Sequence, residues 1–253
     1  MQFTPDPELR EAALEALRAD YKINVDRPGL HQSALSGCLT RAYHDKTDFI
    51  PPTDKSVGFF VIGFAFERVL LASEENRPES FEVDGITLSL DTKNLFGPAD
   101  LKTTRKNPNG RKGENGFQPP ASWPVQFKAY RYGLNRMAAV CRSGNYCWIH
   151  GDKEERCPEI AYDFGVIVLH LLGGELMGWR YTFTPEELDE NWQWLLQRKR
   201  QLEWMLAHED AQPFQHNADW ECLECVYSLR CGLQASLQGL QKPVNVLQLS
   251  DYQ

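Results

Sequence analysis

A few acidic residues and one lysine in the first half of the chain could support phosphodiester chemistry. Asp91 is followed by the Asp-x-Lys sequence Asp100-Leu101-Lys102, and Glu67 precedes them. Hydrolysis of a phosphodiester requires stabilisation of charge on the phosphate oxygens and a nucleophilic water, and divalent cations held by carboxylates provide both. Mg2+ and Mn2+ select such oxygen ligands. An isolated Asp-x-Lys is more often a surface ion pair, so its surroundings must be considered.

The segment that carries these residues has the pattern of strands. Residues 81–92 alternate apolar and polar positions, with a turn expected at Asp84-Gly85, and a second strand should carry Asp100 and Lys102. Residues two apart in a strand face the same side of a sheet. We therefore expect the Lys102 ammonium group to lie at the metal-bound water or the scissile phosphate. Asp84 is an alternative to Asp91 as the first aspartate of this pair.

Four cysteines form a second candidate site. Cys38 lies near the start of the chain, and Cys222, Cys225 and Cys231 follow in C-x2-C-x5-C spacing near its end. Cysteine thiolates are the preferred ligands of iron-sulfur clusters and structural zinc, and four of them complete a tetrahedral site. We expect the metal to crosslink the two ends of the chain. Ligand type alone permits either zinc or a cluster.

Periodicity and capping signals predict the elements that position these residues. Thr184 and Glu187 form a capping box, which is a strong helix start. The other expectations are a helix from residue 6 to about 21, a short helical segment over 33–43, a helix over about 57–73, a helix over 125–140, strands over 162–172 and 180–183, and a helix from 184 to about 208.

The distribution of charge indicates a possible DNA contact. The chain has a formal net charge of -8, but the stretch KTTRKNPNGRK from Lys102 to Lys112 contains five basic residues and no acid. Local clusters of Lys and Arg supply phosphate contacts, and they matter more than the total charge. A solvated loop is the other interpretation. The candidate DNA-binding residues are Arg105, Lys106, Arg111 and Lys112.

Composition and hydropathy limit the class of protein. Hydrophobic residues make up 42% and charged residues 25% of the chain, as in ordinary globular proteins, so extensive disorder is not expected. The longest apolar stretch, 164–172, is interrupted by His170 and is far shorter than the roughly 20 residues that cross a bilayer. The start of the chain is acidic and lacks the pattern of a signal peptide. We expect a cytoplasmic protein with no membrane partner, in which reduced cysteines bind metal.

Taken together, the order of these motifs resembles the PD-(D/E)XK nuclease superfamily. The stretch VDGITLSLD ending at Asp91 and the stretch GPADLKTT containing Asp100 and Lys102 resemble its second and third motifs. Gln126-Phe-Lys-Ala-Tyr130 matches the Q-x3-Y motif of its RecB-like group, and Glu67 stands where many members carry a histidine. With the four cysteines, the chain resembles the iron-sulfur branch of that group, which includes the CRISPR-associated "Cas four" nucleases and the nuclease domain of AddB.

The resemblance implies a fold, a site and cofactors. The fold is α/β, a central mixed sheet flanked by helices with a restriction-endonuclease-like core, in which the N- and C-terminal segments are joined by an iron-sulfur cluster. It implies one nuclease domain over 1–253, a core over about 57–208, and cluster-binding segments over about 30–45 and 215–235. The implied catalytic residues are Glu67, Asp91, Asp100, Lys102, Gln126 and Tyr130. The implied ligands of Mg2+ or Mn2+ are Glu67, Asp91, Asp100 and the backbone carbonyl of Leu101, and those of a 4Fe-4S cluster are Cys38, Cys222, Cys225 and Cys231.

The function implied by the resemblance is that of a metal-dependent DNA exonuclease acting at single-stranded ends, in CRISPR spacer acquisition or DNA repair. Expected partners are DNA and either CRISPR integration proteins or a repair helicase. Two alternatives stay open. One is a recombinational-repair exonuclease with no CRISPR link, and the other is a catalytically silent DNA-binding subunit.

Overall fold

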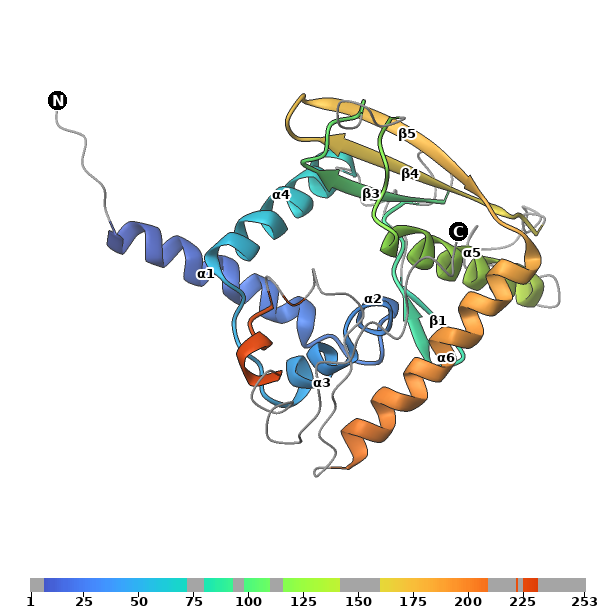
Figure 1. The fold of residues 1–253 in the computed structure, drawn as a ribbon, viewed down its shortest axis with the longest axis horizontal. Coiled ribbons are helices and arrows are strands. Elements are labelled where there is room, and N and C mark those ends of the chain that lie inside the picture. Colours follow the sequence, from blue (N-terminus) through green and yellow to red (C-terminus); the bar gives the residue numbers. More distant parts are fainter. Residues whose placement is uncertain are drawn as a thin grey trace. The chain divides into compact units, whose positions relative to one another are not determined.

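The computed structural model describes residues 7–71, 80–92, 98–109, 116–141, 160–208, 222 and 225–231 of the chain. The chain divides into two compact units (Figure 1). The terminal unit comprises Met1–Pro28, Gly37–Ala65 and Leu202–Gln253, and the sheet unit comprises Gly29–Ser36 and Phe66–Gln201. The predicted extent of a single nuclease domain over 1–253 stays a prediction.

The sheet unit contains a mixed three-stranded sheet in the order β3-β4-β5. Strand β3 (Ala99–Thr104) runs parallel to β4 (Asp163–His170), and β4 runs antiparallel to β5 (Glu175–Thr182). Alternate residues of β4 are buried, as expected for a strand that covers a core with one face. In the register of the parallel pair, Asp100 lies opposite Val166 and Lys102 opposite Val168. Asp100 and Lys102 therefore lie opposite apolar residues of the central strand β4.

Helix α5 (Ser122–Cys141) lies in the connection between the parallel strands β3 and β4, which need a crossover of this kind. It packs on the sheet through aromatic side chains. The Phe127 and Tyr130 rings lie 5.4 and 5.7 Å from the Phe164 ring of β4. Phe127 and Phe164 are fully buried. This packing fixes the helix that carries Gln126 and Tyr130 relative to the strands.

A small hairpin and helix α6 complete the sheet unit. Strands β1 (Phe81–Val83) and β2 (Ile86–Leu88) are joined by a turn in which Asp84 and Gly85 have φ values of 52° and 75°. Both residues of such a tight hairpin turn need positive φ, which Asp-Gly tolerates. Helix α6 (Pro185–Ala207) packs on α5, since Trp192 stacks on Tyr132 at 4.6 Å. The short helix α2 (Gln32–Ser36) contacts α6 through a hydrogen bond from Arg198 Nε to the Leu35 carbonyl.

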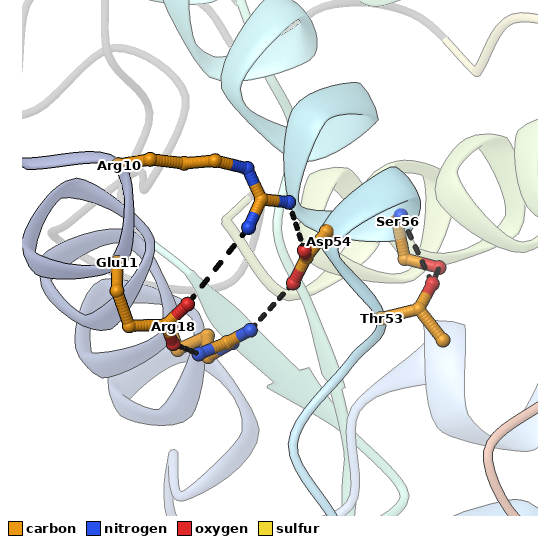
Figure 2. A network of polar contacts seen from close by, with 6 residues as sticks. All are labelled: Arg10, Glu11, Arg18, Thr53, Asp54 and Ser56. Atoms are coloured by element: carbon orange, nitrogen blue, oxygen red, sulfur yellow. Dashed lines mark hydrogen bonds and ion pairs between the residues drawn. The ribbon is translucent and has the colours of Figure 1, made fainter. Parts of the chain in front are cut away.

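The terminal unit contains α1 (Pro7–Val25), α3 (Leu39–Thr47) and the first twelve residues of α4 (Asp54–Leu70). Figure 2 shows how α1 is joined to the start of α4: both Arg10 and Arg18 form ion pairs with Asp54. The Thr53 hydroxyl accepts a 3.3 Å hydrogen bond from the Ser56 backbone N, which caps the first turn of α4. Such exposed ion pairs contribute little stability individually, so the network chiefly sets orientation.

The sequence predicted the fold class at a coarse level. A mixed α/β fold with a mixed sheet flanked by helices is confirmed. The Thr184–Glu187 capping box is also confirmed, because the Thr184 N donates to Glu187 Oε2 at 2.8 Å and the Glu187 N donates to Thr184 Oγ1 at 3.2 Å. The restriction-endonuclease-like core and the joining of the ends by a cluster stay predictions. Within the part of the chain that the structure describes, no helix is long and apolar enough to cross a membrane.

Some element boundaries differ from the predicted ones. Helix α1 continues to Val25 rather than ending near Tyr21, since Lys22 and Asp26 form an i,i+4 ion pair across its last turn. The predicted helical segment over 33–43 is two helices, because Cys38 is in an extended conformation (φ -68°, ψ 117°) between α2 and α3. Strand β5 starts at Glu175 rather than Arg180, directly after Gly174, whose φ is +66°.

Candidate functional site

The two aspartates of the candidate active site are placed together by a local bridge. Thr92 and Ala99 exchange both backbone hydrogen bonds at 3.3 Å in an antiparallel pair. The register of this pair sets Asp91 opposite Asp100. The backbone N of Leu101 donates a 2.7 Å hydrogen bond to Asp91 Oδ2. The aspartate that follows β2 is therefore anchored to the strand that carries Asp100 and Lys102.

The electrostatic environment of Asp91 is that of a carboxylate beside other carboxylates. Burial raises the pKa of Asp91 well above its usual value, and the negative charge of Asp100 raises it further. Lys102 and the Leu101 N-H oppose that increase, while the charge of Glu67 adds to it. Like charges this close favour either a proton or a cation between them. The structure thus groups Asp91 and Asp100, with Glu67 of α4 near enough to influence them.

Asp100 is the more deeply buried of the pair, with 1% of its surface exposed. The Lys102 Nζ lies 2.5 Å from Asp100 Oδ2 as an ion pair, but the alignment is not that of a hydrogen bond. Neither carboxylate oxygen has a hydrogen-bond donor among the described residues. A buried acceptor left in this state is costly. Hard oxygen ligands that lack a donor fit a divalent cation such as Mg2+ or Mn2+.

A chain of polar contacts fixes the position of the Lys102 ammonium group. Lys102 Nζ donates to Gln126 Oε1 at 2.9 Å, and Gln126 Nε2 donates to the Tyr130 hydroxyl oxygen at 2.7 Å. Gln126 and Tyr130 are separated by one turn of α5, so their side chains lie on one face of the helix. The predicted residues Asp100, Lys102, Gln126 and Tyr130 are therefore joined in one network.

No group of three or more His, Cys, Asp or Glu side chains is arranged to hold a metal ion within the ranges the structure describes. The carboxylate site thus consists of two adjacent aspartates, and Glu67 acts on them through its charge. A direct contact of Glu67, or of the Leu101 carbonyl, with a cation stays a prediction. Asp84, the alternative to Asp91, lies in the β1-β2 turn, where its Oδ2 accepts a 2.9 Å hydrogen bond from Trp192 Nε1. Asp91 is the aspartate beside Asp100.

The four predicted cluster ligands lie in the terminal unit, and three of them act on Cys231. The pKa of the Cys231 thiol is raised to about 11, chiefly by burial and then by the neighbouring thiols of Cys38, Cys225 and Cys222 in that order. None of the four belongs to a disulfide. A bound cation would reverse this effect and favour thiolates. Four cysteine thiols are the ligand type of a zinc ion or an iron-sulfur cluster, but the described cysteines are not arranged as a metal-holding group.

The basic segment after β3 is only partly described. Arg105 and Lys106 are exposed directly after the strand. The Lys106 ammonium donates to the Gln118 carbonyl at 3.0 Å, and the Lys106 carbonyl lies 2.8 Å from His170 Nδ1. Arg111 and Lys112 lie outside the described residues. The aromatic rings of Trp123 and Tyr130 are 9% and 5% exposed and belong to the core.

Sequence reasoning missed the residues that support the cysteine segment. Tyr227 is fully buried, and its hydroxyl donates to Asp45 Oδ1 at 2.8 Å. The sequence feature that could have indicated a supporting role for Tyr227 was its position between Cys225 and Cys231. Its partner Asp45 lies far away in the sequence and carries no motif of its own.

Comparisons with known proteins give little further information. No family model matches the chain, and no curated protein matches it. Five chains of solved structures are similar to it. One of them, titled "Crystal structure of SSO0001", is 13% identical over 89% of this chain and 97% of its own length, with a TM-score of 0.47. A likeness of this degree does not bear on activity, substrate or partners.

Proposed function

We propose that the chain is a metal-dependent deoxyribonuclease of the PD-(D/E)XK type that acts on DNA ends. The observation that carries this proposal is the Asp100 carboxylate, which is buried opposite Asp91 without a hydrogen-bond donor and lies beside the Lys102 ammonium group. A surface ion pair, the ordinary interpretation of Asp-x-Lys, would leave the carboxylate in water. Burial of two adjacent carboxylates costs free energy that a structural role does not require.

Each residue of the network then has a chemical role. Asp91 and Asp100 would hold the Mg2+ or Mn2+ ion, and Glu67 would complete or tune its ligands. The ion supplies charge stabilisation and a nucleophilic water at neutral pH. Lys102 stabilises negative charge that develops on the phosphate in the transition state, a role that needs a preorganised cation. Gln126 accepts a hydrogen bond from the Lys102 ammonium and thereby restricts its position.

The remaining features agree with this proposal. Cys38, Cys222, Cys225 and Cys231 of the terminal unit would hold the 4Fe-4S cluster implied by the resemblance. Arg105 and Lys106, exposed at the end of the strand that carries Asp100, would contact the DNA backbone. The role would be prespacer processing in CRISPR spacer acquisition, with integration proteins as partners, or DNA repair with a helicase. A repair exonuclease without CRISPR link and a silent DNA-binding subunit remain the alternatives.

The experiment is a cleavage assay on end-labelled single-stranded and double-stranded DNA, with Mg2+, with Mn2+ and with a chelator. We expect cleavage from DNA ends with either cation and none with the chelator. Asp100→Asn should abolish cleavage while Asp163→Asn, which changes an exposed carboxylate paired with Arg180 on the same sheet, should not. Tight DNA binding by the parent protein without any cleavage would favour the silent subunit instead.

A further inference from the structure

The segment that carries the last two cysteines is attached to the rest of the terminal unit by contacts that involve no metal. Tyr227 lies between Cys225 and Cys231 and is fully buried. Its hydroxyl donates to Asp45 Oδ1 at 2.8 Å and accepts a 3.1 Å hydrogen bond from the backbone N of Ile50. One side chain thus connects the cysteine segment both to α3 and to the loop that follows this helix.

Two further contacts reinforce this attachment. The Tyr227 ring stacks on the ring of His44 with centroids 5.1 Å apart. Arg230 forms an ion pair with Asp48, one residue past the end of α3. The segment therefore meets α3 and the residues after it at three side chains: His44, Asp45 and Asp48. All of these contacts lie within the terminal unit.

The acceptor of the Tyr227 hydroxyl is itself held in place. Arg41 Nε lies 3.6 Å from Asp45 Oδ2, on the same face of α3, and the other end of the Arg41 guanidinium donates to the Tyr21 hydroxyl at 3.1 Å. Asp45 is thereby oriented by α1 and α3 independently of Tyr227. A preorganised acceptor lowers the cost of forming the hydrogen bond.

Backbone hydrogen bonds within the segment fix Cys225 and Cys231 relative to Tyr227. The Ser228 N donates to the Cys225 carbonyl at 3.1 Å, and the Cys231 N donates to the Tyr227 carbonyl at 2.9 Å. The residues from Cys225 to Cys231 therefore form a compact turn and a short helical segment centred on Tyr227. Cys38, the fourth ligand, immediately precedes α3, the helix that carries Asp45.

We propose that Tyr227 is the positioning residue of the four-cysteine centre, which docks the 225–231 segment, with Cys225 and Cys231, on the helix that Cys38 precedes, before a metal is bound. This rests on the proposed metal centre but does not depend on nuclease activity. Ligands from opposite ends of a chain must otherwise be brought together at the cost of closing a very long loop. Docking through Tyr227 meets most of that cost during folding, so the metal has only to draw together cysteines that already belong to one docked unit. The metal then reinforces an attachment that already exists.

Hydrogen exchange of metal-free protein tests the first part of the proposal. The amides of Ile50, Ser228 and Cys231 should be protected in the metal-free parent. Tyr227→Phe keeps the ring on His44 but removes both hydroxyl contacts, so these amides should exchange about tenfold faster or more. Tyr181→Phe, which changes a tyrosine of the sheet unit, should leave them unchanged. Exchange at the unprotected rate in the metal-free parent would overturn the proposal.

Titration of metal-free protein with Co2+ tests the second part, because the absorption of Co2+ reports tetrahedral thiolate ligation whichever metal is native. Tyr227→Phe should bind Co2+ about tenfold more weakly than the parent, since the docking contact contributes that factor. Asp45→Asn keeps an acceptor and should retain most of the affinity, whereas Asp45→Ala should resemble Tyr227→Phe. Equal Co2+ affinity in the parent, Tyr227→Phe and Asp45→Ala would contradict a positioning role. If Tyr227→Phe does not fold, the comparison of Asp45→Asn with Asp45→Ala and the hydrogen exchange of the metal-free parent still test the proposal.

Failure of this inference and failure of the proposed function give different results. Protein that binds Co2+ as described but cleaves no DNA would leave the positioning role intact and refute the nuclease. Protein that cleaves DNA but does not protect the amides of Ser228 and Cys231 without metal would refute the positioning role and leave the nuclease intact.

Discussion

Asp91 lies opposite Asp100 across the Thr92–Ala99 bridge, and its Oδ2 is tied by a 2.7 Å hydrogen bond to the backbone N of Leu101. This hydrogen bond prevents Asp91 from turning away from the carboxylate that repels it. Like charges directly opposite each other on neighbouring strands destabilise a sheet. Such a pair is therefore most stable when a cation lies between the two groups.

The first prediction concerns the stability of this pair. Asp91→Asn removes the repulsion and keeps an acceptor for the Leu101 N. In the presence of a chelator of divalent cations, this variant should therefore have a free energy of unfolding about 1 kcal/mol higher than the parent at pH 8. Mn2+ should stabilise the parent by about 2.7 kcal/mol at a concentration of 100 times Kd. The same addition should not stabilise Asp91→Asn. Thermal unfolding with and without Mn2+ measures both effects, and equal Mn2+ stabilisation of the two proteins would contradict the site.

A second prediction separates Tyr130 from Lys102. Tyr130→Phe removes one neutral hydrogen bond from the Gln126 side chain and leaves the contact between Gln126 and Lys102 in place. Its effect on kcat should be about tenfold or less, as for the loss of one hydrogen bond of about 1 kcal/mol. Single-turnover cleavage at saturating DNA measures this effect. A loss as large as that caused by removal of Lys102 would show that Tyr130 itself takes part in the chemistry.

The third prediction follows from His44. Burial and the positive charge of Arg230 lower the pKa of His44, while Asp48 and Asp45 oppose this effect. A depressed pKa in the folded state gives stability that is present above the unfolded value of about 6.5 and is lost as the pH falls through the folded pKa. The thermal midpoint of the parent should therefore fall between pH 7 and pH 5, and that of His44→Gln should fall less. His208→Gln changes an exposed histidine that directly follows α6 and serves as the control. Identical pH profiles for the parent and His44→Gln would contradict the lowered pKa.

The fourth prediction concerns DNA binding. Each phosphate contact contributes a slope of about -0.7 to log affinity against log salt concentration for single strands. Changing Arg105, Lys106, Arg111 and Lys112 together to alanine should flatten that dependence. Arg136→Ala, on the exposed surface of α5, should not. An unchanged slope in the quadruple variant would mean that the segment is a solvated loop.

Local signals in the sequence were sufficient for several elements. The capping box at Thr184 and the Asp84-Gly85 turn each specify backbone geometry within four residues, and both form as expected. The Asp-x-Lys pair placed Asp100 and Lys102 on one face of β3 for the same reason, since alternation along a strand is local. The Q-x3-Y spacing likewise placed Gln126 and Tyr130 one turn apart.

Contacts between distant residues could not be predicted. The hydrogen bond between Tyr227 and Asp45 joins residues 182 positions apart, and no periodic pattern encodes such a contact. The division of the 33–43 segment at Cys38, which is extended between α2 and α3, is likewise not encoded by helical periodicity. The parallel pairing of β3 with β4 depends on the crossover through α5, so it is set by packing rather than by either strand alone.

The most direct test of the account is cleavage of end-labelled DNA by Lys102→Ala, compared with the parent protein, in Mg2+ and in Mn2+. Lys102 acts mainly on transition-state charge, so its removal should lower kcat by about 100-fold to 1,000-fold while DNA affinity stays close to that of the parent. Lys199→Ala, which removes an amine from α6 beside Gly85, is the matched control and should cleave normally. Cleavage by Lys102→Ala at the parent rate with both cations would contradict the assignment of the active site.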